Sequence, residues 1–357
     1  MVITGLVLGA VLGYVLQRSR FCVTGAFRDI YLSRSTRYFT PFLLAIAIQA
    51  VGVAALTGAG VLAPEAASFA PLAVIGGGLL FGVGIIYAGG CATGTYYRAG
   101  EGLIGSWVAL IFYALLASVM KHGPLAAFTD SARSQTIADA TIHETLGVSV
   151  WVPTLVFTAI VGALTVGQVR RSAGKKKVAA LPARRSGIGH YLADIPWSPW
   201  VGGVLLGLIA IAAWVLSTAA GRNGGLGITT PSANIATFLA TGDVTLVDWS
   251  VMLVLGILIG SFAAATLSGE FRWRTPDSRT MLRSAAGGVL MGVGAALAGG
   301  CTIGNSLVET ALFSYQGWVS LVAIMLGTWG AAWFLLVRPQ RATGAGSRPA
   351  PVLTPAA

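Results

Sequence analysis

The sequence predicts an all-α polytopic membrane protein, with about nine transmembrane helices in two inverted repeats whose broken or re-entrant helices surround a central path. Three observations predict this fold class: an apolar composition, recurring apolar segments of membrane-spanning length, and a glycine-rich cysteine motif that occurs twice. Of the 357 residues, 55% are hydrophobic and 10% are charged, whereas soluble domains contain about 25% charged residues. Because lipid offers the backbone no hydrogen-bond partner, apolar segments must form helices or a closed barrel, and continuous apolar runs favour helices.

The predicted helices follow one another with little chain between them. The first carries Gly5, Gly9 and Gly13 at intervals of four, a spacing that lets helices approach closely. It is not expected to be a signal peptide, because no basic segment precedes it and no small-residue cleavage site follows. The third and eighth helices end at the two cysteine motifs, and the fourth and ninth open near Trp107 and Trp318. In chain order, we expect helices at 2–16, 41–58, 72–90, 103–120, 151–169, 200–217, 249–268, 285–300 and 318–337.

A basic, polar joint divides the chain into two parts of similar length. This segment, 170–198, contains RRSAGKKKVAALPARRSG and is expected to be a cytoplasmic linker. It separates a first transmembrane repeat (1–169) from a second, inverted repeat (199–339). The low-complexity residues 340–357 are expected to form a disordered cytoplasmic tail.

The distribution of basic residues predicts the orientation of the chain. With the N terminus outside, 20 of the 23 Lys and Arg residues lie in cytoplasmic segments, and only Lys121, Arg133 and Arg222 lie outside. Cytoplasmic loops of membrane proteins are enriched in these residues. We therefore expect a periplasmic N terminus and a cytoplasmic C terminus. The net charge of +11 then reflects topology, and no nucleic acid partner is expected.

One motif occurs in both halves of the chain. The stretch LLFGVGIIYAGGCATG (79–94) is echoed by VLMGVGAALAGGCTIG (289–304). In the predicted topology, the helix leading into the first copy starts outside and the helix leading into the second starts inside. The halves are therefore expected to be inverted. Inverted repeats with broken helices build many secondary transporters, whose sites lie near the middle of the membrane.

The glycine pairs in these motifs predict a break in each helix, because each glycine costs about 1 kcal/mol relative to alanine in a helix interior. A break leaves backbone N–H groups without partners, and such groups at a helix N-terminus attract anions. Each break also presents a cysteine, whose thiol is a weak donor and whose sulfur is a weak acceptor. This combination suits a ligand with both oxyanion and sulfur atoms. The residues expected to contact it at the two breaks are Gly90, Cys91, Thr93, Gly94, Gly300, Cys301, Gly304 and Asn305.

Two further positions are candidates, and simpler roles remain open for several residues. Cys22 follows the first helix beside Arg20, and Thr229 or Thr230 occupies a loosely corresponding place in the second half, with Thr230 taken as the candidate. A buried cysteine often serves only as a small apolar side chain, and glycines beside it often serve only for helix packing. Asn305 suits a cap on the second break as well as a ligand contact. No metal or nucleotide motif has the required spacing, so no metal, cofactor or catalytic residue is expected.

Five segments follow one another along the chain in this order: RSRFCVTGAFRDIYL, AGGCATGTYYRAGEGLIGSW, GLGITTPSAN, SGEFR and AGGCTIGNSL. Together they resemble the YeeE/YedE family of bacterial sulfur-transport membrane proteins, and its thiosulfate-uptake branch in particular. The resemblance implies a non-enzymatic importer of thiosulfate in the lipid of the inner membrane. It also implies that the ion passes three cysteines, here Cys22, Cys91 and Cys301, by transient S–H to sulfur hydrogen bonds. A separate TusA-like cytosolic sulfurtransferase often accompanies such proteins.

From the predicted topology, we expect the ion to meet Cys91 first, then Cys301, and to leave by Cys22. Neutral thiols are required, because a thiolate would repel a dianion. Two alternatives remain open. The family has members linked to selenium or other sulfur species, and a membrane sulfurtransferase would instead carry a persulfide on Cys91 or Cys22. No basic residue adjoins Cys91 or Cys301 in the sequence, which disfavours the activated thiol that a sulfurtransferase needs.

Overall fold

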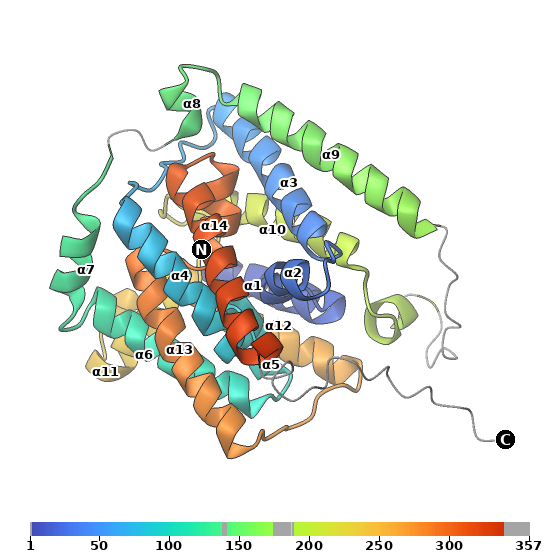
Figure 1. Ribbon diagram of the computed structural model, residues 1–357, viewed down its shortest axis with the longest axis vertical. Coiled ribbons are helices and arrows are strands. Elements are labelled where there is room, and N and C mark those ends of the chain that lie inside the picture. Colours follow the sequence, from blue (N-terminus) through green and yellow to red (C-terminus); the bar gives the residue numbers. More distant parts are fainter. Residues whose placement is uncertain (1, 138–140, 174–186, 188, 339–357) are drawn as a thin grey trace.

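The computed structural model describes residues 2–137, 141–173, 187 and 189–338. Within these residues, nine helical segments are long and apolar enough to cross a membrane. Figure 1 shows them packed together in one bundle, and their order and positions follow the nine predicted helices. The prediction of an all-α polytopic membrane protein is therefore confirmed.

The first half of the chain contains helices α1 to α9. Their bounds are α1 (Val2–Ser19), α2 (Val23–Leu32), α3 (Phe39–Gly58), α4 (Pro71–Tyr87), α5 (Ala92–Gly100), α6 (Ile104–Lys121), α7 (Ala126–Arg133), α8 (Ile142–Thr145) and α9 (Trp151–Ala173). The second half contains α10 to α14 and four short helical turns labelled η. Their bounds are η1 (His190–Asp194), α10 (Pro199–Ala219), α11 (Thr229–Thr241), η2 (Val244–Leu246), α12 (Trp249–Leu267), α13 (Ser278–Ala298), η3 (Gly304–Glu309), α14 (Tyr315–Ala332) and η4 (Trp333–Val337).

Helices α1 and α12 pack closely because glycines line their contact. A Cβ atom on Gly9 would collide with the carbonyl oxygen of Leu253, and one on Gly13 would collide with that of Ile257. Gly5 meets α12 in the same way one turn earlier. The predicted role of this glycine series in helix packing is therefore confirmed.

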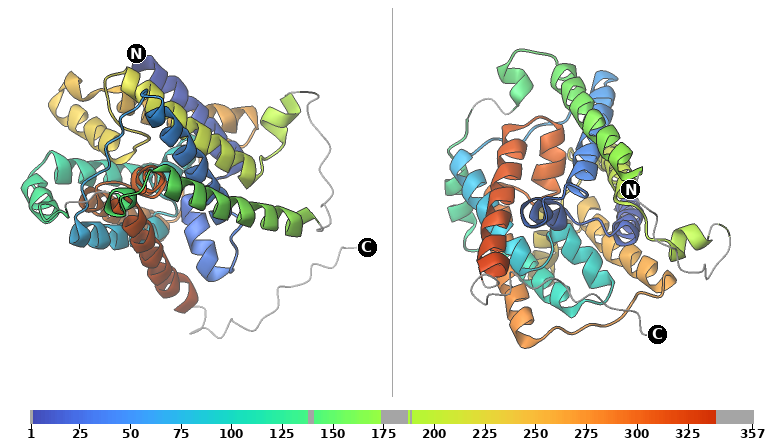
Figure 2. Two further views of the ribbon diagram at one scale, coloured as in Figure 1. Left: turned by 90° about the horizontal axis from the view of Figure 1, so that it is seen from above. Right: turned by 45° about the vertical axis from the view of Figure 1, so that its right-hand side comes forward.

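The helices of the two halves pack in matching pairs. The contact between α1 and α12 corresponds to the contact between α10 and α3. In the same way, the contact between α4 and α14 corresponds to the contact between α13 and α6. The short helices α2 and α11 contact α14 and α6 respectively, while α4 and α13 contact each other. In Figures 1 and 2, α9 lies on the outside of the bundle, where it contacts α3. Among the described helices of the second half, α9 has no counterpart.

The structure differs from the sequence prediction at one helix start, and some predicted segments cannot be compared. Helix α13 begins at Ser278 rather than near residue 285, because its first turns are polar and Asp277 caps them by accepting a hydrogen bond from the backbone N–H of Thr280. Apolar runs do not reveal such a polar helix start. The predicted tail, 340–357, and the middle of the predicted linker lie outside the described residues.

Candidate functional site

The first cysteine motif breaks its helix, as predicted. Helix α4 ends at Tyr87, Gly89 adopts a left-handed backbone conformation with φ of 72°, and α5 begins at Ala92. Cys91 is the N-cap of α5, and its sulfur accepts a hydrogen bond from the backbone N–H of Gly94 at 3.4 Å. The thiol therefore lies at the N-terminus of a helix, where free backbone donors gather.

The second motif also breaks its helix, and Asn305 holds this break together. Helix α13 ends at Ala298, and Gly299 is left-handed with φ of 78°. The Asn305 amide donates to the carbonyl oxygens of Ala298 at 2.9 Å and Gly300 at 3.2 Å, and its oxygen accepts from Gln316 at 3.0 Å. Because these groups satisfy its hydrogen bonds inside the protein, Asn305 has the structural role that the sequence left open.

Cys22 and Cys91 lie side by side. Cys22 is the N-cap of α2, and both sulfur atoms lie 3.5 Å from the point that a Cβ on Gly94 would occupy. The two thiols lie close to each other, and Thr302, the residue after Cys301, lies near the Cys91 thiol, while its buried hydroxyl has no hydrogen-bond partner among the described residues. The two helix breaks and the start of α2 therefore meet at one buried place.

Buried hydroxyl groups accompany the cysteines, and only that of Thr93 belongs to a residue predicted from the sequence. The hydroxyls of Thr24, Thr93, Thr302 and Ser306 are buried without a hydrogen-bond partner among the described residues. A buried polar group without a partner costs on the order of 1–3 kcal/mol. Such hydroxyls are therefore suited to a polar ligand in transit. The sequence signal that marks them is a small hydroxyl residue within a few positions of each cysteine.

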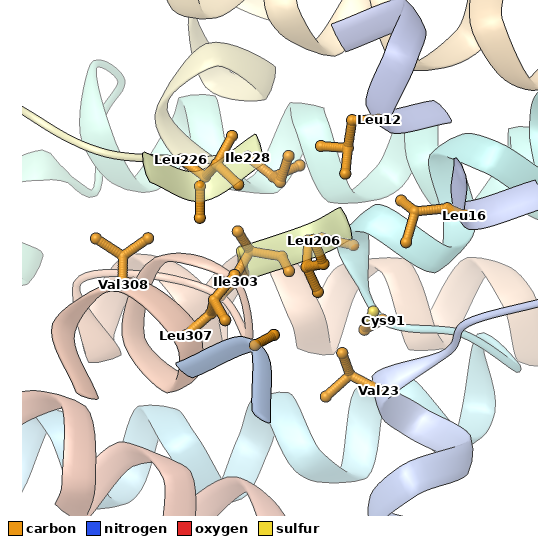
Figure 3. Close-up of a cluster of buried hydrophobic side chains, with 14 of the residues drawn as sticks. Leu12, Leu16, Val23, Cys91, Leu206, Leu226, Ile228, Ile303, Leu307 and Val308 are labelled. Carbon is orange, nitrogen blue, oxygen red and sulfur yellow. The ribbon is translucent and has the colours of Figure 1, made fainter. Parts of the chain in front are cut away.

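Apolar side chains enclose this place. Figure 3 shows Cys91 beside Val23 at one end of a buried cluster, with Leu226, Ile228 and Val308 towards the other end. All three cysteines are buried and free of disulfide bonds. An ion here would exchange water contacts for thiols, hydroxyls and backbone N–H groups.

A cavity of about 220 Å³ opens beside the second break. Arg222, in the loop between α10 and α11, lines it and donates to the carbonyl oxygens of Gly224 at 3.2 Å and Gly225 at 2.9 Å. The loop thereby holds a guanidinium group at the cavity that borders a predicted cysteine. The predicted site residues in its lining are Gly300, Cys301, Gly304, Asn305 and Thr230.

The other two basic residues predicted to lie outside also gather near this cavity. Lys121 donates to the hydroxyl of Thr230 at 2.6 Å. Arg133 donates to Gln316, a further lining residue, at 3.0 Å. Basic groups from α6, α7 and the loop after α10 therefore converge on one cavity. Because these residues are far apart in the sequence, no local pattern indicates that they lie near one cavity.

Glu309 is a largely buried acid in the lining of the same cavity. Its carboxylate accepts a hydrogen bond from the backbone N–H of Ala67 at 3.2 Å. Burial raises the pKa of Glu309, and the Ala67 N–H and Arg133 offset this effect only in part. Glu309 therefore takes up a proton at a higher pH than an exposed glutamate does.

A cluster of charges lies at the other end of α10. The Arg20 guanidinium donates to both carboxylate oxygens of Glu101, at 2.8 and 3.0 Å, and to Glu270 at 2.7 Å. Arg18, whose guanidinium lies 3.8 Å from Glu270, donates to the carbonyl oxygen of Ile195, which precedes α10. Because α10 has 21 residues, this cluster and the cavity are about 30 Å apart along its axis.

The structure does not agree with the expected order of the cysteines. Cys301 lines the same cavity as Arg222. Cys91 instead lies beside Cys22, which follows Arg20 in the chain by two residues. The cause is helix length. Helix α4 has 17 residues, which span about 25 Å, so Cys91 lies about that far from the start of its helix. Cys301 is therefore the cysteine in the cavity lining, and Cys91 and Cys22 lie together outside that lining.

Comparisons with known proteins agree with this architecture. The family model described as sulphur transport matches residues 18–330. The thiosulfate transporter TsuA of Escherichia coli K12 is 51% identical over 341 residues, which cover 96% of each chain. The thiosulfate transporter TsuA of Spirochaeta thermophila is 32% identical over 355 residues, covering 95% of this chain and all of the relative.

A shorter match extends the same relationship. The probable transporter YedE of Salmonella typhimurium is 41% identical over 99 residues, which are 28% of this chain and 24% of the relative. The family match covers both helix breaks, the charged cluster and the cavity. This multi-pass membrane protein therefore belongs to the sulphur transport family.

Proposed function

We propose that this protein imports thiosulfate across the bacterial inner membrane. The relative that is 51% identical along 96% of both chains is named a thiosulfate transporter, and thiosulfate has the features that the site chemistry suits. It carries two negative charges, oxygen atoms that accept hydrogen bonds, and a terminal sulfur that accepts a thiol hydrogen. The observation that carries the proposal is the continuity from the basic cavity, through Cys301 and Thr302, to the paired thiols of Cys91 and Cys22.

In this proposal the ion enters the cavity near Arg222 and then meets Cys301, Cys91 and Cys22 in turn. Neutral thiols attract it weakly, because S–H is a poor donor. Weak attraction is an advantage in transport, since the ion must be admitted and also released. The hydroxyls of Thr93 and Ser306 supply further donors along the way.

We also infer that the two halves are inverted repeats. The matching pairs of packed helices support this inference, as does the presence of one broken helix in each half. The three basic residues that the charge distribution assigns to the outside lie in the lining of this cavity or contact lining residues, so the proposed orientation puts it on the periplasmic side. A separate TusA-like sulfurtransferase on the cytoplasmic side remains part of the proposal, as the acceptor of the imported ion.

Uptake of labelled thiosulfate tests this function, in a bacterial strain that lacks other thiosulfate importers. Cys91→Ala and Cys301→Ala should each reduce uptake to the level of cells without the protein. Ser131→Ala, a change of similar size at an exposed position on α7, serves as the control and should leave uptake unchanged. Full uptake by both cysteine variants would remove the cysteine path from consideration.

Competition in the same assay separates thiosulfate from related substrates. Unlabelled thiosulfate should inhibit uptake more strongly than sulfate, sulfite, selenite or tetrathionate, because only thiosulfate combines a small dianion with a terminal sulfur. Stronger inhibition by selenite would favour the selenium alternative. A sulfurtransferase is tested separately by intact mass, since it would leave one added sulfur atom on Cys91 or Cys22 after exposure to thiosulfate.

A further inference from the structure

A second cavity, of about 770 Å³, lies at the end of α9, and no cysteine is among its lining residues. The loop before α3, the last turns of α9 and the start of α10 form its walls. Figure 2 shows α9 on the outside of the bundle, so this cavity borders the space that lipid occupies around a membrane protein. Its lining consists of Ser35, Thr36, Arg37, Thr40, Ala163, Leu164, Gly167, Gln168, Arg171, Ser198, Pro199 and Trp200.

One side of this cavity is polar and positive. Arg37 from the loop and Arg171 from α9 supply two guanidinium groups, and none of the described lining residues is acidic. Gln168 donates to the hydroxyl of Thr36 at 3.3 Å, but its own amide oxygen is buried without a hydrogen-bond partner among the described residues. The polar side therefore suits a group that offers both a negative charge and a hydroxyl donor.

The other side of the cavity is apolar and continues onto the surface of α9. A Cβ atom on Gly167 would meet no atom within 4 Å, so the floor of the cavity is open at this point. The apolar wall consists of Ala163, Leu164, Pro199 and Trp200, and the exposed face of α9 beyond it includes Val156 and Ile160. A free inorganic anion needs no such wall, whereas an amphiphile needs both sides.

The chain itself is a poor occupant for this cavity. The segment that follows α9 carries Lys175, Lys176, Lys177, Arg184 and Arg185. Its positive charge would oppose Arg37 and Arg171 but would favour an anionic lipid surface. The basic residues at this end therefore argue for a ligand of opposite charge.

We propose that this cavity binds an anionic phospholipid with a hydroxyl-bearing headgroup, such as phosphatidylglycerol. The phosphate lies between Arg37 and Arg171, a headgroup hydroxyl donates to Gln168, and an acyl chain follows the groove over Gly167 along α9. This site is separate from the cysteines, and its existence does not depend on the transported substrate.

Native mass spectrometry of the purified full-length protein tests the proposal. Phosphatidylglycerol, phosphatidylcholine and inorganic phosphate serve as three separate probes. The wild-type protein should retain phosphatidylglycerol in preference to phosphatidylcholine. The double variant Arg37→Gln, Arg171→Gln should bind phosphatidylglycerol about 30-fold more weakly, as expected when two basic contacts are lost. Arg283→Gln, an exposed arginine on α13, is the matched control.

A second pair of variants tests the apolar groove without changing any charge. Gly167→Leu fills the open floor and should also weaken phosphatidylglycerol binding, whereas Gly162→Leu, on the same helix and outside the lining, should not. Equal lipid binding by the double arginine variant and the wild-type protein would overturn the proposal. So would displacement of the lipid by millimolar inorganic phosphate, because the site would then recognise a free anion.

Discussion

At the scale of single residues, Glu309 has the clearest consequence for an anion path. It is a largely buried acid, and it lines the same cavity as Arg222 and Cys301. Ionised, it opposes the entry of a dianion; protonated, it leaves the basic groups unopposed. Because burial raises the pKa of Glu309, protonation occurs while exposed glutamates are still ionised.

The pH dependence of uptake should therefore depend on Glu309. As the external pH falls through the raised pKa of Glu309, initial thiosulfate uptake into proteoliposomes should increase, since thiosulfate itself remains a dianion. Glu309→Gln should show the higher uptake already at pH values above this pKa and lose the increase. Glu65→Gln, which removes an exposed acid of the same lining, should keep it. An unchanged pH profile in Glu309→Gln would contradict this role.

The same shift affects stability with a defined sign. A glutamate whose pKa is raised on folding favours the folded state in its protonated form, and this contribution is lost as the pH rises through the raised pKa. Glu309→Gln should therefore unfold at a higher temperature than the wild-type protein at neutral pH. The difference should disappear at a pH below the ordinary pKa of glutamate, where both proteins are neutral at this position.

Asn305 provides a second test at this scale. Asn305→Asp keeps the shape of the side chain but replaces the amide donor that faces the carbonyl oxygens of Ala298 and Gly300. The unpaired carbonyls should lower the free energy of unfolding by about 1–3 kcal/mol. The same change at Asn223, whose amide donates to the carbonyl oxygen of Ala63 at 2.9 Å in an exposed position, should cost less, because water can replace this hydrogen bond. Equal losses of unfolding free energy in the two variants would show that the Asn305 hydrogen bonds do not stabilise the second helix break.

Features that depend on neighbouring residues, such as the two helix breaks, could be predicted from the sequence. Contacts between residues far apart in the chain could not. Cys91, Cys301 and the glycines beside them follow from a repeated motif, because adjacent glycines oppose a helix wherever they occur. The contact between Thr302 and the Cys91 thiol joins the two halves of the chain, so no local pattern contains it. The same holds for Arg222, which reaches the cavity from a loop.

At the scale of elements, the glycine seam between α1 and α12 determines how closely the halves pack. Gly9→Ala would bring a methyl group against the carbonyl oxygen of Leu253, a backbone atom that cannot move alone. We expect a loss of about 1–3 kcal/mol in the free energy of unfolding, as for other overpacked contacts. Gly162→Ala, whose Cβ would meet no atom within 4 Å, should be neutral or stabilising by up to about 1 kcal/mol. Thermal unfolding in detergent distinguishes the two, and equal melting temperatures would show that the seam can relax.

The helices themselves were largely predictable, because each membrane-spanning segment has a continuous apolar run. The exceptions have physical causes. The polar first turns of α13 hide its start at Ser278, and α7 and α8 are too short and polar to produce an apolar signal. The depth of each break also escaped prediction. It depends on helix length and packing, and this is why the order of Cys91 and Cys301 was expected to be the reverse.

At the scale of the whole molecule, the Arg20 cluster and the cavity lined by Arg222 differ in how their charged side chains are paired. Arg20 is bound to Glu101 and Glu270, which come from the two halves, so this cluster ties the halves together beside the Cys22 segment. Arg222 lines the cavity and donates instead to backbone carbonyl oxygens, and no ion pair ties it to a carboxylate among the described residues. In the proposed path, the cavity is therefore the end at which an anion enters.

This difference predicts which cysteine reacts from which side. In variants that keep one cysteine and replace the other two by serine, a small anionic methanethiosulfonate reagent added outside should modify Cys301 faster than Cys91 and Cys22. Added to inverted vesicles, the same reagent should modify Cys22 fastest. Arg222→Gln should slow the outside reaction of Cys301 by at least about tenfold for the anionic reagent, because a focused positive field raises the local anion concentration, and much less for a cationic one. Faster outside modification of Cys91 than of Cys301 would restore the order first expected from the sequence, since the reagent has to pass whichever thiol lies nearer the entrance.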